Sequence, residues 1–436
     1  MSLKQSRVSN QKDVKKYSLK SNFMWVLIGN VIFGLSQWLI IAVMSKIGNI
    51  NMVGEYTLAL GITAPLFLFF NMNLRYVQAT DQQNEYNFVD YFSLRSLTSL
   101  VSLILIILST YIFKYSLSTS LIIIMVGLIK YIESQSDVIY GFFQKKENMK
   151  LISQSYILKG FLNVITFILI LETTNNLLVC LIIMAVLNMF VFLFFDMKNF
   201  YELGEKKLKL IDYLGVLKNK KKFILIVATV IPLGIASSLD SLTINSQRYI
   251  IESTISITEV GYFSSITYLM ISGQTIVGAL SQASLPRLSR YFVEDFKKYL
   301  KFTFSLLAVG ILLGLFLILS SYFIGDVILS ILYTKDFVKY SNVFLIVMVA
   351  ASVWYITGFL NSALVATRQF NSQLIVYSLS FIVTLILSLI LIKEYGLVGA
   401  AYSLLAGMIT RLLVITLVLI KILTRRKCIN SIYPRI

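Results

Sequence analysis

Hydrophobic runs of about 20 residues alternate with short polar segments along nearly the whole chain. An α-helix of that length crosses the apolar core of a bilayer, which is about 30 Å thick. The pattern therefore predicts transmembrane helices, whereas a β-barrel would show alternating segments of about ten residues. The chain has room for twelve such helices, at residues 23–44, 54–76, 92–112, 120–143, 151–171, 177–195, 223–247, 259–285, 301–325, 340–362, 374–393 and 397–423.

The longest polar segment between two spans divides the predicted helices into two sets of six. Two six-helix lobes related by a parallel repeat are a plan that transporters use, with the substrate path between the lobes. A weak internal repeat supports this division, because Val53-Gly54-Glu55-Tyr56 and Val260-Gly261-Tyr262-Phe263 open equivalent spans. The expected parts are a cytoplasmic N-terminal tail (1–22), an N-lobe (23–195), a basic cytoplasmic linker (196–222), a C-lobe (223–423) and a basic cytoplasmic C-terminal tail (424–436).

Composition and charge support an all-α polytopic membrane protein. Hydrophobic residues make up 57% of the chain, and the mean hydropathy of +0.79 is too high for a water-soluble domain of this size. The net charge of +18 comes from Lys and Arg in the tails and alternate loops, which places both termini in the cytoplasm and gives no nucleic-acid signal.

Cys180 and Cys428 show no disulfide, zinc or redox spacing. Because histidine is absent, carboxylates remain for any proton coupling.

The predicted helix at 120–143 carries charged residues within its apolar run. Lys130, Glu133 and Asp137 share one face of a helix, so only the opposite face suits lipid. An ionised group at bilayer depth costs several kcal/mol and normally points into a bundle or a wet cavity. Two interpretations stay open: a structural salt bridge of Lys130 with Glu133 or Asp137, or a role in transport. In either case we expect one acid to remain without a partner.

Other predicted spans carry polar stripes at helical spacing. Lys130, Lys159 and Arg411 lie near mid-depth in three different spans, and if they converge they form a positive chamber for an anionic headgroup. Lys and Arg are also the usual ligands of phosphate oxygens, although Lys159 has the alternative of extending to the cytoplasmic interface. The remaining polar positions singled out are Asn30, Gln37, Asn163, Asp240, Asn245 and Arg248.

Several segments resemble the polysaccharide biosynthesis proteins of the flippase type (Wzx-like), and the similarity extends over nearly the whole chain. The segments are Val53-Gly54-Glu55-Tyr56, Leu58-Ala59-Leu60-Gly61-Ile62-Thr63-Ala64-Pro65-Leu66, Asn73-Leu74-Arg75, Ala79-Thr80-Asp81, Leu285-Pro286-Arg287-Leu288 and Tyr395-Gly396-Leu397-Val398-Gly399-Ala400-Ala401. None of them is a catalytic signature, so we do not expect an enzyme.

This resemblance implies the fold of the multidrug/oligosaccharidyl-lipid/polysaccharide exporter superfamily, with two six-helix lobes around a central cavity. It implies a flippase of the bacterial cytoplasmic (inner) membrane that moves an undecaprenyl-diphosphate-linked oligosaccharide repeat unit to the outer leaflet by alternating access, for O-antigen or capsular polysaccharide synthesis. No cofactor is expected, but coupling to a proton or sodium gradient is. The implied partners are the polyprenyl-diphosphate-linked oligosaccharide, membrane lipid, a polysaccharide polymerase and a chain-length regulator.

Under this interpretation the polar residues take three roles. We assign headgroup attraction to the cations and substrate contacts to the amides, coupling or counter-charge to the acids, and a cytoplasmic gate or loop structure to two residues of the second-span motif. The substrate-binding set is Lys130, Lys159, Arg248, Arg411, Asn30, Gln37, Asn163 and Asn245. The coupling set is Glu133, Asp137 and Asp240, and the gate set is Arg75 and Asp81. No metal site is expected.

Three other functions are weighed against the flippase. A small-molecule or drug antiporter of the same superfamily should have a more apolar chamber, and the three mid-depth cations argue against it. A membrane polysaccharide polymerase needs a sizeable outward loop to bind sugars, whereas the predicted outward loops are short. Lipid II flippases are near relatives, but most have fourteen spans.

Overall fold

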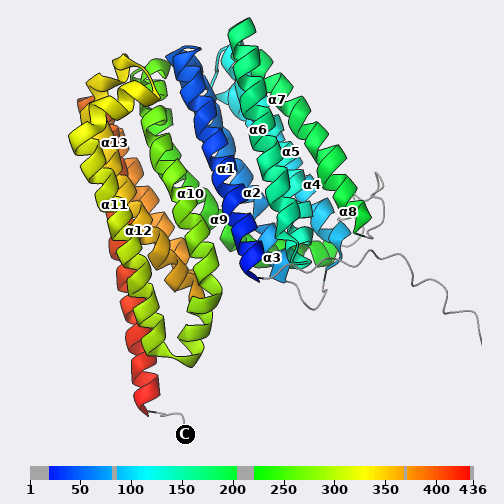
Figure 1. Ribbon diagram of the computed structural model, residues 1–436, viewed down its shortest axis with the longest axis vertical. Helices are drawn as coiled ribbons and strands as arrows, with labels where there is room; N and C mark the ends of the chain where they lie inside the picture. The colour runs from blue at the N-terminus through cyan, green and yellow to red at the C-terminus, as the bar shows by residue number, and fades with distance from the viewer. Residues whose placement is uncertain (1–18, 81–85, 204–219, 368–370, 433–436) are drawn as a thin grey trace, which may run out of the picture. The chain divides into compact units, whose positions relative to one another are not determined.

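The computed structural model describes residues 19–80, 86–203, 220–367 and 371–432, and most of these residues are helical, with no β-strand in the described ranges. The prediction of an all-α protein is confirmed. In chain order the helices are α1 (Leu19–Lys46), α2 (Ile50–Asn71), α3 (Leu74–Thr80), α4 (Phe88–Ile112), α5 (Leu117–Lys145), α6 (Met149–Thr174), α7 (Leu177–Val191), η1 (Phe192–Met197), α8 (Lys198–Glu202), α9 (Lys220–Thr254), α10 (Ile257–Glu294), α11 (Phe296–Leu332), η3 (Lys335–Tyr340), α12 (Ser341–Ala366) and α13 (Asn371–Ile432) (Figure 1).

Each of the twelve predicted spans corresponds to a helical segment. By length and composition, ten helices among the described residues are suited to cross a membrane. One of them, α13, contains two predicted spans, because Gly396 interrupts it with a φ of +58° that a residue with a Cβ rarely adopts. The remaining predicted span, 223–247, lies in α9, which is helical from Lys220 to Thr254 but richer in polar residues.

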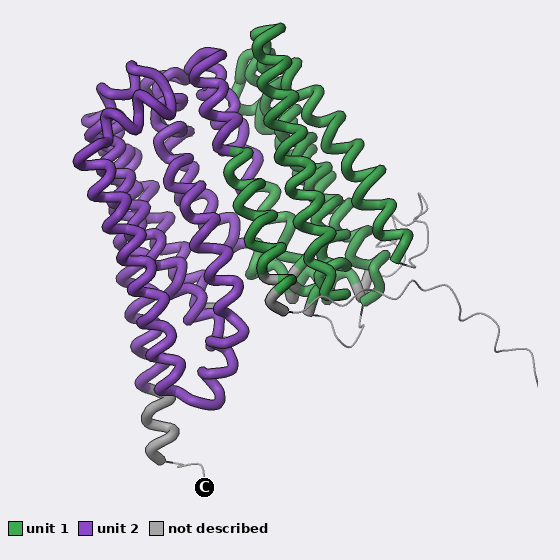
Figure 2. Tube along the Cα trace, in the orientation of Figure 1, with its two compact units in different colours: residues 1–37, 66–234 green, residues 38–65, 235–436 purple. Residues whose placement is uncertain are grey.

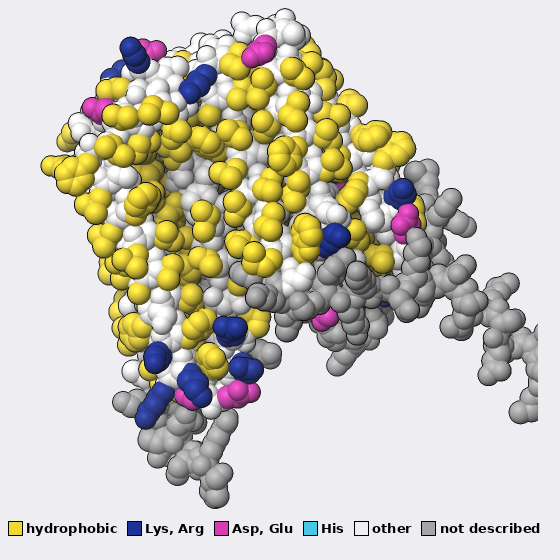
Figure 3. Space-filling model, in the orientation of Figure 1, with side chains coloured by type: hydrophobic (Ala, Val, Ile, Leu, Met, Phe, Trp, Pro, Cys, Tyr) yellow, Lys and Arg dark blue, Asp and Glu magenta, His cyan; other side chains and the backbone are white. Residues whose placement is uncertain are grey.

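These helices expose many large apolar side chains on the protein surface. On α11 the exposed fractions of Leu312, Phe316 and Phe323 are 67%, 68% and 74%. Figure 3 shows hydrophobic side chains covering most of the visible helix surfaces, with charged groups gathered near helix ends. Because the backbone of a helix satisfies its own hydrogen bonds, such helices are stable when lipid covers the apolar side chains.

The chain forms two compact units (Figure 2). Unit 1 comprises residues 1–37 and 66–234, and unit 2 comprises residues 38–65 and 235–436. Residues 38–65, which the sequence analysis places in the N-lobe, are thus grouped with unit 2. The predicted lobes and the central cavity between them stay predictions.

In unit 2, two segments of similar sequence meet at their glycines. Gly54 of α2 lies against the backbone carbonyl of Ile257, and Gly261 of α10 lies against the backbone carbonyl of Ile50. A Cβ at either glycine would overlap the opposite backbone, so both positions need a residue without a side chain. The contacts are reciprocal, as expected for repeats related by a pseudo-two-fold axis.

In unit 1, α5 is the central helix. It packs against α3, α4, α6 and α7. An apolar cluster that includes Phe92, Val138 and Val230 joins α4, α5 and α9. Ser134 of α5 is hydrogen-bonded to Ser99 of α4 at 2.7 Å. These contacts hold the polar face of α5 toward its neighbours rather than toward lipid.

Candidate functional site

The charged face of α5 lines a cavity of about 180 Å³ inside unit 1. The helix begins at Ser116, whose side chain accepts a hydrogen bond from the Thr119 N–H at 3.2 Å. Phe33 and Phe67 form the apolar part of the cavity wall. Its polar part consists of Asn71, Lys130, Glu133, Ser134, Asp137, Tyr140, Tyr156 and Lys159. The prediction that the charged residues of α5 face the protein interior is therefore confirmed for this helix.

Lys130 and Glu133 form an ion pair one turn apart on α5. The Lys130 Nζ donates to Glu133 Oε2 at 2.8 Å, and the side chains are 25% and 23% exposed. Both residues also line the cavity. The structural ion pair of Lys130 with Glu133 is thus present, and it lies at a cavity wall, while the role in transport stays a prediction.

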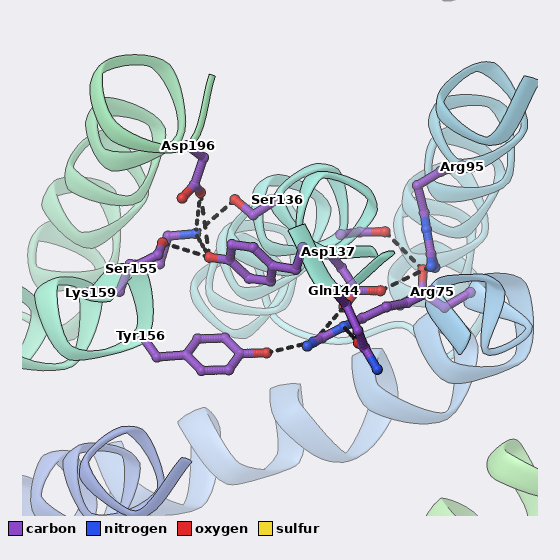
Figure 4. Close-up of polar contacts among 12 residues, drawn as sticks. Arg75, Arg95, Ser136, Asp137, Gln144, Ser155, Tyr156, Lys159 and Asp196 are labelled. Carbon is purple, nitrogen blue, oxygen red and sulfur yellow. Dashed lines mark hydrogen bonds and ion pairs between the residues drawn. The ribbon is translucent and has the colours of Figure 1, made fainter. Parts of the chain in front are cut away.

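Asp137 is held between two arginines from different helices. Arg75 Nη1 lies 3.3 Å from Asp137 Oδ1, and Arg95 Nη2 lies 3.0 Å from Oδ2 (Figure 4). Arg75 also donates to Gln144 at 3.0 Å and to the Tyr156 hydroxyl at 3.1 Å. The expectation that one acid of α5 would lack a partner is wrong, because α3 and α4 supply two cations that spacing along α5 cannot reveal.

Arg75 reaches this position because the chain changes direction between α2 and α3. Met72 and Asn73 have positive φ values of 50° and 49°, and α3 begins directly afterwards at Leu74. The sequence assigned Arg75 to a cytoplasmic gate or to loop structure; the structure places it on α3, bridging α5 and α6. The gate role stays a prediction, and Asp81, its proposed companion, lies outside the described residues.

Lys159 of α6 is buried and fully hydrogen-bonded. Its ammonium group donates to Ser136 Oγ at 2.7 Å, to the Tyr140 hydroxyl at 2.9 Å and to Asp196 Oδ2 at 3.1 Å (Figure 4). The side chains of Lys159 and Asp196 are 2% and 0% exposed. The alternative that Lys159 extends to the membrane interface does not hold, since its head group lies among α5, α6 and η1.

Sequence reasoning missed Asp196 and Arg95. Asp196 follows the apolar run 177–195 directly and was therefore taken as the first residue of the basic linker. In the structure the helix continues through the π-helical turn η1 and α8 to Glu202, which turns Asp196 inward. Arg95 lies near the start of a predicted span. A cation so close to a helix end usually lies at the membrane surface, so the sequence did not indicate that Arg95 is buried. It is 1% exposed.

Unit 2 contains the other predicted cations. Arg411 Nη2 lies 2.6 Å from Asp240 Oδ1, and the Arg411 guanidinium lies 4.9 Å from the ring centroid of Tyr377. The side chains of Arg411 and Asp240 are 4% and 34% exposed. Lys130 and Lys159 thus share a cavity in unit 1, whereas Arg411 belongs to unit 2. Convergence of all three cations stays a prediction.

Arg248 of α9 is 1% exposed and donates to the backbone carbonyl of Thr57 at 3.1 Å. The next residue, Tyr249, donates to the carbonyl of Gly61. That carbonyl lacks its usual helical partner because Pro65, four residues later, has no N–H. Arg248 and Tyr249 therefore join α9 to α2 within unit 2. The role in substrate binding that the sequence assigned to Arg248 stays a prediction.

The predicted amide contacts divide into two kinds. Asn163 accepts a hydrogen bond from Asn188 at 3.1 Å, and Asn245 donates to the carbonyl of Ser241 at 2.8 Å. Both amides are buried and take part in helix packing. Asn30 and Gln37 are half-buried on α1. The substrate contacts proposed for these four residues stay predictions.

Comparison with known proteins supports the resemblance seen in the sequence. The chain is 29% identical over 384 residues to the capsular polysaccharide biosynthesis protein CapF of Staphylococcus aureus, covering 88% of this chain and 94% of that protein. No protein-family model matches the chain. The predicted resemblance to polysaccharide biosynthesis proteins is confirmed by this similarity.

Solved transporters share the fold. The lipid II flippase MurJ in an inward closed conformation has a TM-score of 0.70 at 13% identity, covering 91% of this chain and 87% of that one. A MOP superfamily transporter from Pyrococcus furiosus has a TM-score of 0.65 at 11% identity, covering 91% and 92%. The Vibrio cholerae MATE transporter VcmN, as a variant, has a TM-score of 0.64 at 12% identity, covering 93% and 96%. The chain is thus a multi-pass membrane protein with a transporter fold, and these comparisons agree with the prediction that it is not an enzyme.

Proposed function

We propose that this protein is a flippase that carries a polyprenyl-diphosphate-linked oligosaccharide from the cytoplasmic to the outer leaflet by alternating access, during capsule or O-antigen synthesis. The similarity to a capsular polysaccharide biosynthesis protein supports the pathway class. The fold shared with MurJ, described as a lipid II flippase, supports a lipid-linked substrate.

The observation that carries the proposal is the basic character of the cavity in unit 1. Lys130, Lys159, Glu133 and Asp137 line the cavity. Arg75, Arg95 and Asp196 pair with these residues from behind the wall, so the described ion pairs of this cluster contain four bases and three acids. Within a low-dielectric wall this excess of positive charge attracts an anion. Lys and Arg bind phosphate oxygens through charge-assisted hydrogen bonds, so a diphosphate is the ligand chemistry that fits.

The cavity has room for a phosphate headgroup. Its volume is about 180 Å³, well above the roughly 10 to 15 Å³ that a single water molecule needs. A phosphate headgroup fits in that space. In this proposal the headgroup enters the cavity of unit 1, and the sugar repeat unit is recognised elsewhere.

The same charge argues against a drug antiporter. A carrier of organic cations would attract them with acids that outnumber bases, whereas acids do not outnumber bases in the lining of this cavity or in the described ion pairs behind it. We further propose that the protein lies in the bacterial cytoplasmic membrane with both termini in the cytoplasm. Transport responds to a proton or sodium gradient through Glu133, Asp137 or Asp240 in this proposal. The partners proposed for it are a polysaccharide polymerase and a chain-length regulator.

Reconstituted transport tests the proposal. The substrate is an undecaprenyl-diphosphate-linked oligosaccharide with a fluorescent sugar, and an impermeant quencher reports how much of it remains in the outer leaflet of the vesicles. Proteoliposomes containing the purified protein should move this substrate out of reach of the quencher faster than empty vesicles do. Lys130→Glu should slow this transfer about tenfold, equivalent to a loss of about 1.4 kcal/mol of binding. The matched control is Lys301→Glu, because Lys301 is exposed on α11 and does not line the cavity.

Two results would contradict the proposal. One is a wild-type rate equal to that of empty vesicles, and the other is an unchanged rate in Lys130→Glu protein recovered at normal abundance. Transport of an organic cation in place of the lipid-linked sugar would favour the antiporter.

A further inference from the structure

Lys159 lies between a cavity and a buried acid. Its side chain forms part of the cavity wall, yet Asp196, its ionic partner, is not part of that wall and is 0% exposed. The three N–H groups of the ammonium are all occupied, by Ser136, Tyr140 and Asp196. An anion that enters the cavity can therefore bind Lys159 only by replacing one of these three acceptors.

Asp196 is the acceptor whose replacement changes the charge of the site. Its Oδ2 accepts from Lys159 at 3.1 Å and lies 3.4 Å from the Tyr140 hydroxyl, while Oδ1 is buried without a hydrogen-bond partner. Once Lys159 turns to another anion, a charged Asp196 is left in a site that excludes water. A buried charge without a partner destabilises the protein by about 3 to 5 kcal/mol. Asp196 avoids this cost if it takes up a proton and becomes neutral.

The neighbouring charges do not supply a second cation for Asp196. On α5, Lys130 is paired with Glu133, while Asp137 is shared by Arg75 of α3 and Arg95 of α4. The remaining titratable groups at the cavity are the hydroxyls of Tyr140 and Tyr156. Among the described ion pairs, Lys159 is the only base on Asp196.

A route for the proton is also present. Tyr140 lines the cavity, and its hydroxyl contacts Asp196 Oδ2 as well as Ser155 at 2.7 Å. A hydroxyl both donates and accepts hydrogen bonds, so it can pass a proton from the cavity to a carboxylate without carrying a net charge itself. The unpartnered Oδ1 offers a free position on the same carboxyl group.

We propose that Asp196 is a proton-binding group of this transporter, and that its protonation releases Lys159 to bind a phosphate oxygen of the substrate. This inference rests on the proposed function, because it assumes an anionic substrate in the cavity. The Asp196 carboxylate gains one proton from the cavity, and one N–H of Lys159 passes from Asp196 to the phosphate. Proton and substrate then bind together, and by linkage each strengthens the binding of the other.

The direction of transport is compatible with this coupling. A diphosphate diester carries two negative charges, and a proton bound beside it lowers the charge that must cross the apolar part of the membrane. An inside-negative potential favours outward movement of the remaining negative charge by about 2.3 kcal/mol per 100 mV. The loaded site therefore retains a driving force after it accepts the proton.

Calorimetry on the purified full-length protein tests the inference, with farnesyl diphosphate as the probe. Titrations in two buffers of different ionisation enthalpy should show uptake of about one proton per bound diphosphate, and affinity should rise by up to about tenfold for each unit of decreasing pH. Asp196→Asn should bind the probe without proton uptake and with little pH dependence. Glu202→Gln, an exposed acid six residues later in the chain, should behave like the wild type.

A second variant covers the case in which Asp196→Asn does not fold. Lys159→Gln/Asp196→Asn removes both charges, so it leaves no buried ion unpaired, and it should bind the probe more weakly without proton uptake. Proton uptake equal to that of the wild type in either variant would overturn the inference. Wild-type binding without proton uptake would overturn this inference alone, whereas absence of any wild-type binding would overturn it together with the proposed function.

Discussion

Each unit of the protein contains one deeply buried base from the middle of a predicted span, and the two differ in how their acids are placed. In unit 1, Lys159 and Asp196 are 2% and 0% exposed, and every N–H of the ammonium has an acceptor. In unit 2, Arg411 is 4% exposed, but Asp240 is 34% exposed. The Arg411 Nε has no hydrogen-bond partner. The Nη2 lies within ion-pair distance of Asp240, but the two groups are not oriented for a hydrogen bond.

This difference separates two kinds of intramembrane ion pair. Asp240 is partly exposed, although the Oδ1 next to Arg411 is buried, so we expect removal of Arg411 to leave its charge less isolated than that of Asp196 and the pair to contribute modestly. Water does not reach Asp196, so its charge depends on Lys159. We therefore expect the exposure of the acid, and not the type of base, to decide how strongly the two groups of each pair are coupled.

The largest effect should come from breaking the pair in unit 1. Lys159→Met removes the base from buried Asp196, which should lower the free energy of unfolding by up to about 3 to 5 kcal/mol at a pH where Asp196 stays charged, and by less at lower pH, where Asp196 takes up a proton. Thermal unfolding of the detergent-solubilised protein measures this loss. Adding Asp196→Leu should restore much of the stability, because both charges are then gone. A single variant as stable as the wild type at every pH would show that the charge of Asp196 does not depend on Lys159.

An intermediate effect is expected in unit 2. Arg411→Met removes the ion pair with Asp240 and the contact of the guanidinium with the Tyr377 ring, and leaves an acid that water can reach. We expect a loss of about 1 to 2 kcal/mol. The same unfolding assay measures it. A loss as large as that of Lys159→Met would mean that the exposure of the acid does not decide the strength of the coupling.

The smallest effect should come from a pair in which both partners are exposed. Arg290 and Glu294 lie 3.6 Å apart on α10, with exposed fractions of 60% and 62%. Arg290→Ala should change stability by less than about 0.5 kcal/mol. This variant provides the baseline for the unfolding assay, and a larger change would indicate that α10 contacts something else at this point.

The sequence located α5 and its interior face because three charged residues within one apolar run can share a side of a helix at 3.6 residues per turn. The same period placed Ser155, Lys159 and Asn163 on one face of α6, and all three are buried. It did not locate Asp196, because the apolar run ends at the preceding residue and a helix boundary inferred from hydropathy is uncertain by several residues. The π-helical turn that directs Asp196 inward has no signature in the hydrophobic pattern.

What the sequence by itself determined was the set of helices and the side on which each is polar. Both follow from local quantities, namely the length of an apolar run and the spacing of polar residues within it. Only the tertiary structure decided which acid meets which base. Asp137 is paired with Arg75 and Arg95, and Lys159 with Asp196, because α3, α4 and η1 happen to pack against α5 and α6. A side chain reaches only a few ångströms, so its partner depends on which helices are neighbours, and hydrophobic helices give few signals of that choice in their own sequences.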